Sequence, residues 1–175
     1  RPQPQETEIG DDGAAILEFN SVEFLPGEKP DAEALKVGRR TRDEVDEACP
    51  RHGEVQSLTD EAANTIRREG NYQGPAAYGT KVHTELKRRI DAMDDPDFRA
   101  EVSASKSDAA ATYGTKGSIR VDVLERVGNG TVCVYDIKTG NARLGLSRIG
   151  EIANNVHSFY PDTNRILVIE ARPGK

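Results

Sequence analysis

Three charged residues on two neighbouring segments of the chain could do chemistry together. Asp122 stands in the run Val-Asp-Val-Leu, Asp136 and Lys138 stand in Val-Tyr-Asp-Ile-Lys, and a Gly-Asn-Gly turn at 128–130 separates the two segments. Side chains alternate along a strand, so Asp136 and Lys138 should share a face, and a tight hairpin should bring Asp122 close to them. Because an unpaired charge is costly to bury among apolar neighbours, a shared site is the simpler interpretation.

These groups suit a divalent cation and phosphate chemistry. Two converging carboxylates repel each other unless a cation lies between them, and oxygen ligands without His or Cys suit Mg²⁺ or Mn²⁺. A lysine beside such an ion can orient or deprotonate water and offset charge on a phosphate, as hydrolysis of a phosphodiester requires. The alternative is that Asp122 and Asp136 are strand residues on a solvated face, paired with Arg120 and Lys138.

The elements expected around this hairpin follow the order helix, three strands, helix, strand. Apolar residues at helical spacing mark the helices, and alternating or continuous apolar residues mark the strands. Helices are expected over 76–93 and 146–160, and strands over 98–104, 118–127, 131–138 and 165–170. The last strand follows a helical crossover and is continuously apolar, which predicts a parallel strand covered on both faces. The fold class is therefore α/β, with a mixed sheet flanked by helices.

The first part of the chain differs in composition. Residues 1–70 carry 9 Lys+Arg and 17 Asp+Glu and the remainder carries 15 and 13, so the net charge of −6 divides into −8 and +2. Residues 1–55 are acidic, contain several prolines and lack clear periodicity, which favours a linker or a partly ordered, irregular extension. The domain is expected over 56–175, with its core at 76–172.

Two cysteines, Cys49 and Cys133, lie far apart in the sequence and lack Cys-x-x-Cys spacing. A buried thiol at Cys133, inside an apolar strand, is the favoured interpretation, and a disulfide between the two stays open. Nothing in their spacing indicates a zinc site.

The spacing D-x(13)-D-x-K on paired strands, within an αβββαβ order, resembles the PD-(D/E)XK nuclease superfamily, which has the restriction-endonuclease fold. The resemblance covers the expected core. It implies that Asp122 and Asp136 bind the metal and that Lys138 helps to activate water. Many members add a Glu from the first core helix, for which Glu85 is the best candidate here. The residue before Asp122 is Val121, where the family motif has Pro.

Several basic or polar residues are candidates for contact with a nucleic acid. Arg143 and Thr139 follow the D-x-K strand, where a loop could reach a phosphate. Lys81 and the stretch Lys87-Arg88-Arg89 lie on the first helix, where a solvated face is an equally good interpretation. The remaining candidate is Arg120, two residues before the first Asp. By contrast, His83 is expected to be a surface residue, with a substrate contact left open.

The resemblance implies a Mg²⁺- or Mn²⁺-dependent DNA endonuclease. An acidic lead-in followed by a compact nuclease resembles the toxin domains that end bacterial polymorphic toxins. That likeness implies secretion within a larger effector, action in the cytoplasm of a target cell, and a cognate immunity protein as partner. Alternatives are an RNase toxin of the tRNA-cleaving type, a cytoplasmic repair or recombination nuclease, and a non-catalytic nucleic-acid- or protein-binding module. No apolar run approaches the roughly 20 residues that span a bilayer, so no membrane association is expected.

Overall fold

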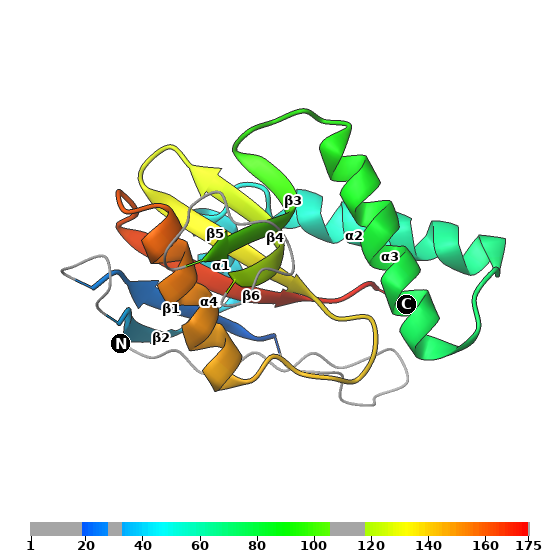
Figure 1. Ribbon diagram of the computed structural model, residues 1–175, viewed down its shortest axis with the longest axis horizontal. Coiled ribbons are helices and arrows are strands. Elements are labelled where there is room, and N and C mark those ends of the chain that lie inside the picture. Colours follow the sequence, from blue (N-terminus) through cyan, green and yellow to red (C-terminus); the bar gives the residue numbers. More distant parts are fainter. Residues whose placement is uncertain (1–18, 28–32, 106–117, 175) are drawn as a thin grey trace.

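The computed structural model describes residues 19–27, 33–105 and 118–174 (Figure 1). Ten elements follow one another along these residues. They are β1 (Ser21–Leu25), β2 (Leu35–Arg39), α1 (Arg42–Ala48), α2 (His52–Glu69), α3 (Gly74–Asp91), β3 (Phe98–Ser105), β4 (Ser118–Val127), β5 (Thr131–Ile137), α4 (Leu146–Phe159) and β6 (Arg165–Ala171).

The strands form one six-stranded sheet in the order β2-β1-β6-β5-β4-β3. β5 and β6 run parallel and α4 connects them, whereas each other neighbouring pair is antiparallel. The expected hairpin is present between β4 and β5, where Gly130 adopts a positive φ of 84°. The α/β class, the mixed sheet and the order α3-β3-β4-β5-α4-β6 agree with the αβββαβ prediction.

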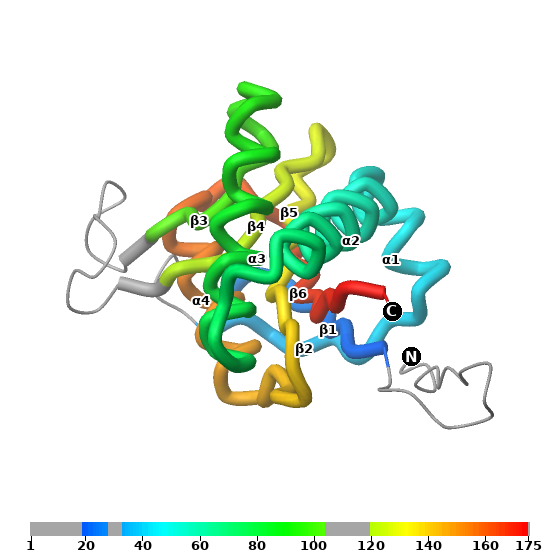
Figure 2. Tube along the Cα trace, turned by 90° about the vertical axis from the view of Figure 1, so that its right-hand side faces the viewer, coloured from blue at the N-terminus to red at the C-terminus, as the bar shows by residue number. Residues whose placement is uncertain are grey.

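Helices cover both faces of the sheet (Figure 2). On one face, α2 and α3 pack on Cys133, Tyr135 and Ile137 of β5, together with Leu167 and Ile169 of β6. On the other face, α4 packs on alternate residues of the same two strands, Val132, Val134, Ile166 and Val168. Each buried aliphatic side chain stabilises the fold by about 1.5–3 kcal/mol, and the two-sided burial explains the apolar sequence of β6.

The described residues before position 56 belong to this domain. β1 pairs with β6 and brings β2 into the sheet, and Cys49 at the end of α1 forms a disulfide with Cys133 in β5. α1 begins with a capping box between Thr41 and Glu44. Of the two alternatives for 1–55, a linker is excluded for residues 19–27 and 33–55, which form an ordered part of the domain, and of the two alternatives for Cys133 the structure has the disulfide. The expected boundary at 56 falls inside α2, and residues 1–18 lie outside the described residues.

Within the described part of the chain, no helix has the length and apolar character needed to cross a membrane.

Candidate active site

β4 and β5 separate at Asp122. The pairing between them runs from Val127 opposite Thr131 to Val123 opposite Tyr135 and ends there, while β4 continues to pair with β3. Beyond this point the Asp122 side chain, and not the β4 backbone, is hydrogen-bonded to β5. Its Oδ2 accepts a hydrogen bond of 2.8 Å from the Ile137 amide. The Asp122 carboxylate is thus held in the split between two diverging strands.

The backbone is irregular at the same level of β3. Glu101, which the register places across from Asp122, has a φ of 51°, a left-handed conformation that is strained for a residue with a Cβ. The residues on either side of this level pack in different layers, Ala100 and Val123 with α2 and α3, and Val102 and Val121 with α4. The alternation of faces is therefore interrupted where Asp122 lies.

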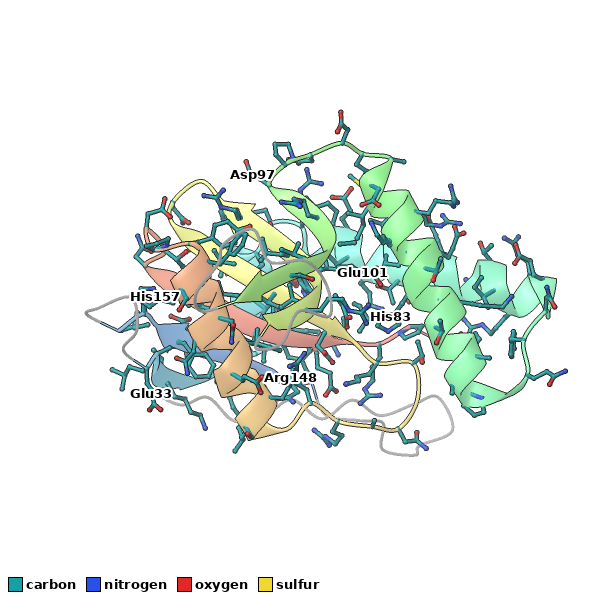
Figure 3. The ribbon with its side chains drawn as sticks, viewed as in Figure 1. Glu33, His83, Asp97, Glu101, Arg148 and His157 are labelled. Atoms are coloured by element: carbon teal, nitrogen blue, oxygen red, sulfur yellow. A yellow bond between two sulfur atoms is a disulfide. The ribbon has the colours of Figure 1, made fainter. Side chains whose placement is uncertain are left out.

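His83 projects from α3 toward the strands (Figure 3) and contacts both strands at the split. Its Nδ1 lies 3.4 Å from Asp122 Oδ1, and its Nε2 lies 3.0 Å from the Ile137 carbonyl oxygen. Both ring nitrogens face acceptors, so only the doubly protonated ring can donate to both. The hydrogen bond to Asp122 accordingly raises the pKa of His83, against the opposing effect of burial. The expectation of a surface histidine was wrong, since this side chain is 24% exposed and contacts the site.

Glu85 lies on the other flank of α3, away from this cluster. Its Oε2 is 2.6 Å from Arg88 Nη2 and 2.7 Å from Arg89 Nε, and Arg89 also contacts Glu61 of α2. Residues two apart on a helix project about 200° apart, so His83 and Glu85 cannot both face the split. The expected place of Glu85 among the metal ligands is therefore corrected, and the hydrogen bond from Arg88 lowers the pKa of its carboxyl group.

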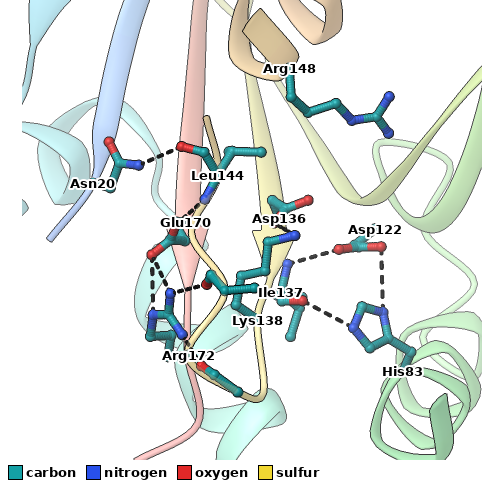
Figure 4. A network of polar contacts seen from close by, with 12 residues as sticks. Asn20, His83, Asp122, Asp136, Ile137, Lys138, Leu144, Arg148, Glu170 and Arg172 are labelled. Carbon is teal, nitrogen blue, oxygen red and sulfur yellow. Dashed lines mark hydrogen bonds and ion pairs between the residues drawn. The ribbon is translucent and has the colours of Figure 1, made fainter. Parts of the chain in front are cut away.

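Asp136 and Lys138 lie at the end of β5, near Asp122 (Figure 4). Lys138 Nζ is 3.2 Å from Asp136 Oδ2, but this buried oxygen receives no well-aligned hydrogen bond from any described residue, so the contact is an ion pair. Burial raises the pKa of Asp136, the nearby charge of Asp122 raises it further, and Lys138 opposes both. The two carboxylates thus sense each other's charge, and one oxygen keeps its lone pairs available.

A second layer of contacts holds the loop after Lys138. Glu170 of β6, in register with Asp136, accepts a hydrogen bond of 2.7 Å from the Leu144 amide and pairs with Arg172 at 3.0 Å. Arg172 also donates to the carbonyl oxygens of Gly140 and Ala142. Sequence reasoning missed this pair, although a buried Glu that ends an apolar strand is a signal of such a role.

The residues predicted to contact nucleic acid are scattered. Thr139 packs against Gly79 of α3, so closely that a Cβ at position 79 would lie 2.8 Å from its Oγ1. Arg120 lies 3.5 Å from Glu101, and Arg143 is exposed in the loop before α4. Lys81 lies two residues before His83, about 200° round α3 from the side that faces the split. The stretch 87–89 is engaged in ion pairs with Asp91, Glu85 and Glu61.

Among the described residues, one group of three potential metal ligands has its ligand atoms within 4.8 Å of one another, and it lies elsewhere. It consists of Cys49, Cys133 and Glu125, and the two sulfur atoms are bonded to each other. The candidate active site therefore offers two carboxylates, Asp122 and Asp136, rather than the three acids expected.

Comparison with protein-family models, with curated proteins and with solved structures found no match to this chain. The resemblance to the PD-(D/E)XK nucleases thus stays a prediction, carried by the geometry of the split and by the order of the elements.

Proposed function

We propose that this protein is a metal-dependent nuclease that hydrolyses phosphodiester bonds at the split between β4 and β5. The observation that carries the proposal is the grouping of Asp122, Asp136 and Lys138 where the two strands part, with Asp136 Oδ2 buried and lacking an aligned hydrogen bond from the described residues. Buried polar atoms are normally satisfied, so such an oxygen beside a second carboxylate is suited to a cation.

The donor set fits a hard divalent cation. Mg²⁺ commonly binds one or two carboxylates and completes its octahedron with waters and substrate phosphates, so two acids suffice without Glu85. Asp122 and Asp136 would hold the ion. When bound, it would supply Lewis-acid polarisation of the phosphate and lower the pKa of a bound water.

The remaining groups of the site have separate tasks. Lys138, whose side chain is 29% exposed, can hydrogen-bond the attacking water and offset the charge that develops on the phosphate. His83 and the Ile137 amide each hold one oxygen of Asp122, which orients that carboxylate. His83 is thus a positioning residue rather than a group that contacts the reacting atoms.

DNA is the polymer that we propose, with action as an antibacterial toxin in the cytoplasm of a target cell. The Cys49–Cys133 disulfide supports export, because disulfides form and persist in oxidising compartments and are rare in the cytosol. A cell that produces such a nuclease must be protected from it. A cognate immunity protein that covers the split therefore belongs to the same proposal.

Cleavage of supercoiled plasmid and of total RNA, each with Mg²⁺, Mn²⁺ or EDTA, tests the proposal. We expect plasmid cleavage that EDTA abolishes and that Asp136→Asn or Lys138→Ala reduces by at least about 100-fold. Glu85→Gln is the matched control, since Glu85 is an acid of the same region that faces away from the split. Cleavage of RNA alone would redirect the substrate to RNA, and a folded wild type that cleaves neither polymer with any metal would refute the nuclease.

A further inference from the structure

The cations around the split differ in how many of their donors are already used. Arg172 is taken up by Glu170 and by two loop carbonyl groups, and Arg120 pairs with Glu101. Arg143 is exposed and has no ion-pair partner among the residues that the structure describes. Among the cations that the structure describes near the split, Arg148 is the one that is both anchored beside it and left with donors to spare.

Arg148 reaches the split from the first turn of α4. Its Nη2 donates a hydrogen bond of 3.1 Å to the carbonyl oxygen of Arg120, which lies two residues before Asp122 on β4. Two strand residues span about 7 Å, so the guanidinium is held against the backbone of β4 close to the residue that carries the carboxylate. In the view of Figure 4 it extends from α4 above Asp122. The anchor restricts the side chain without using up its five N–H donors.

The other contact of Arg148 is weak. Its Nη1 lies 3.6 Å from Glu151 on the same helix, and the two side chains are 41% and 56% exposed. Exposed pairs of this kind contribute about 0–1 kcal/mol and are readily exchanged for a better partner. A planar guanidinium with free donors is the group that proteins favour for bidentate binding of a phosphate.

Arg148 and Lys138 also lie on the same face of the sheet. β5 places Val132 and Val134 in the α4 layer, so by alternation Asp136 and Lys138 project to that side. The opposite side is closed by α3, through His83 on Asp122 and through Gly79 on Thr139. A phosphate that touches Lys138 therefore has α4, and not α3, as its other wall.

We propose that Arg148 and Lys138 form a phosphate-binding subsite on the α4 side of the split, which holds the substrate backbone against Asp122 and Asp136. This proposal rests on the proposed nuclease function. In it Arg148, instead of Arg143, anchors the phosphate backbone of the substrate. Its ligand is a phosphodiester group of a nucleic-acid strand.

Binding without cleavage tests the subsite. Fluorescence anisotropy would be measured with fluorescein-labelled 20-nucleotide probes, namely duplex DNA, single-stranded DNA and RNA, in Ca²⁺ and in EDTA. We expect Arg148→Ala to raise the Kd about 10- to 100-fold and to reduce the salt dependence of binding by about one phosphate contact. Arg143→Ala, an exposed arginine five residues earlier, should change the Kd by less than about 3-fold.

Arg148→Gln guards against a folding artefact, because it keeps an uncharged polar side chain with good helix propensity at this position and removes the guanidinium charge. It should bind as weakly as Arg148→Ala while its thermal unfolding matches the wild type. A folded Arg148→Ala with wild-type Kd and salt slope would overturn the subsite even if the wild type cleaves DNA. If the wild type binds through Arg148 but never cleaves, the subsite is supported and the proposed nuclease function is refuted. If the wild type binds no probe, both proposals are refuted.

Discussion

Removal of the Cys49–Cys133 disulfide should destabilise this protein by about 4.5 kcal/mol. The two cysteines are separated by 84 residues, and closing a loop of that size removes a large part of the conformational entropy of the unfolded chain. The chain-entropy relation for such a loop gives about 4.5 kcal/mol at 25 °C. Both cysteines are 0% exposed, so replacing them with Ala leaves no buried polar group to add a separate penalty.

For a chain of this size, each kcal/mol lost shifts the Tm by roughly 2–4 °C, so the Tm should fall by about 9–18 °C. The measurement is thermal unfolding followed by circular dichroism, with the wild type in the presence and absence of a phosphine reductant. The Cys49→Ala/Cys133→Ala variant should melt near the reduced wild type, and the reductant should not shift it further.

A loss below about 1 kcal/mol would refute this reasoning. It would mean that β1, β2 and α1 are held by strand pairing and core packing alone, and that the loop between the cysteines is already restricted in the unfolded chain. A free-thiol titration that finds two thiols in the air-oxidised, unfolded protein would refute the premise that the disulfide forms. Removal of the disulfide also bears on the candidate active site, because Cys133 precedes Asp136 by three residues on β5.

Three further changes test how the site and the sheet are held. Gly79→Ala places a Cβ 2.8 Å from Thr139 Oγ1 and should therefore lower DNA cleavage about 10-fold. Because Ala has the higher helix propensity, the free energy of unfolding should stay within about 1 kcal/mol of the wild type. The double variant with Thr139→Ala should recover cleavage. His83→Ala releases one oxygen of Asp122 and should lower the activity or the Mg²⁺ affinity about 10- to 100-fold, measured as cleavage rate against Mg²⁺ concentration. Glu23→Gln should cost about 2 kcal/mol at pH 7 in urea unfolding, less than a fully buried pair because Arg165 is 35% exposed.

The cost at Glu23 should depend on pH in a defined direction. Burial alone would raise the pKa of Glu23, but hydrogen bonds from Arg165 and Arg40 outweigh it and the pKa is lowered. The charged carboxylate therefore stabilises the fold above the ordinary value of 4.5, and that stabilisation is lost as the pH falls through the lower folded-state pKa. The gap between wild type and variant should narrow below pH 4.5, and a constant gap from pH 7 to 3 would contradict the assignment.

Recovery of cleavage in the Gly79/Thr139 double variant is the decisive outcome for that pair. Persistent loss would mean that Gly79 acts on the helix itself rather than through Thr139. For His83, wild-type cleavage in a folded His83→Ala protein would mean that the Ile137 amide alone orients Asp122.

Local pattern was sufficient for the core that carries the site. Apolar periodicity predicts α3, β3, β4, β5, α4 and β6 in order, and the Gly-Asn-Gly turn predicts the hairpin between β4 and β5. These features depend on residues close in sequence, where backbone geometry and side-chain alternation are decided by neighbours. The same alternation placed Asp136 and Lys138 on one face before any partner strand was known.

Tertiary packing decided the rest. β1 is short, and it becomes a strand because β6, about 145 residues later, offers it a backbone edge. His83 and Glu85 flank one buried stripe of α3, and the packing of α3 beside β4 and β5 brings His83 to Asp122, whereas Glu85 pairs with Arg88 and Arg89 of its own helix. The helical period alone sets the angle between two side chains, whereas the neighbours that each one meets depend on segments distant in sequence. The same is true of the disulfide, since spacing along the chain carries no information about which sulfur atoms become adjacent.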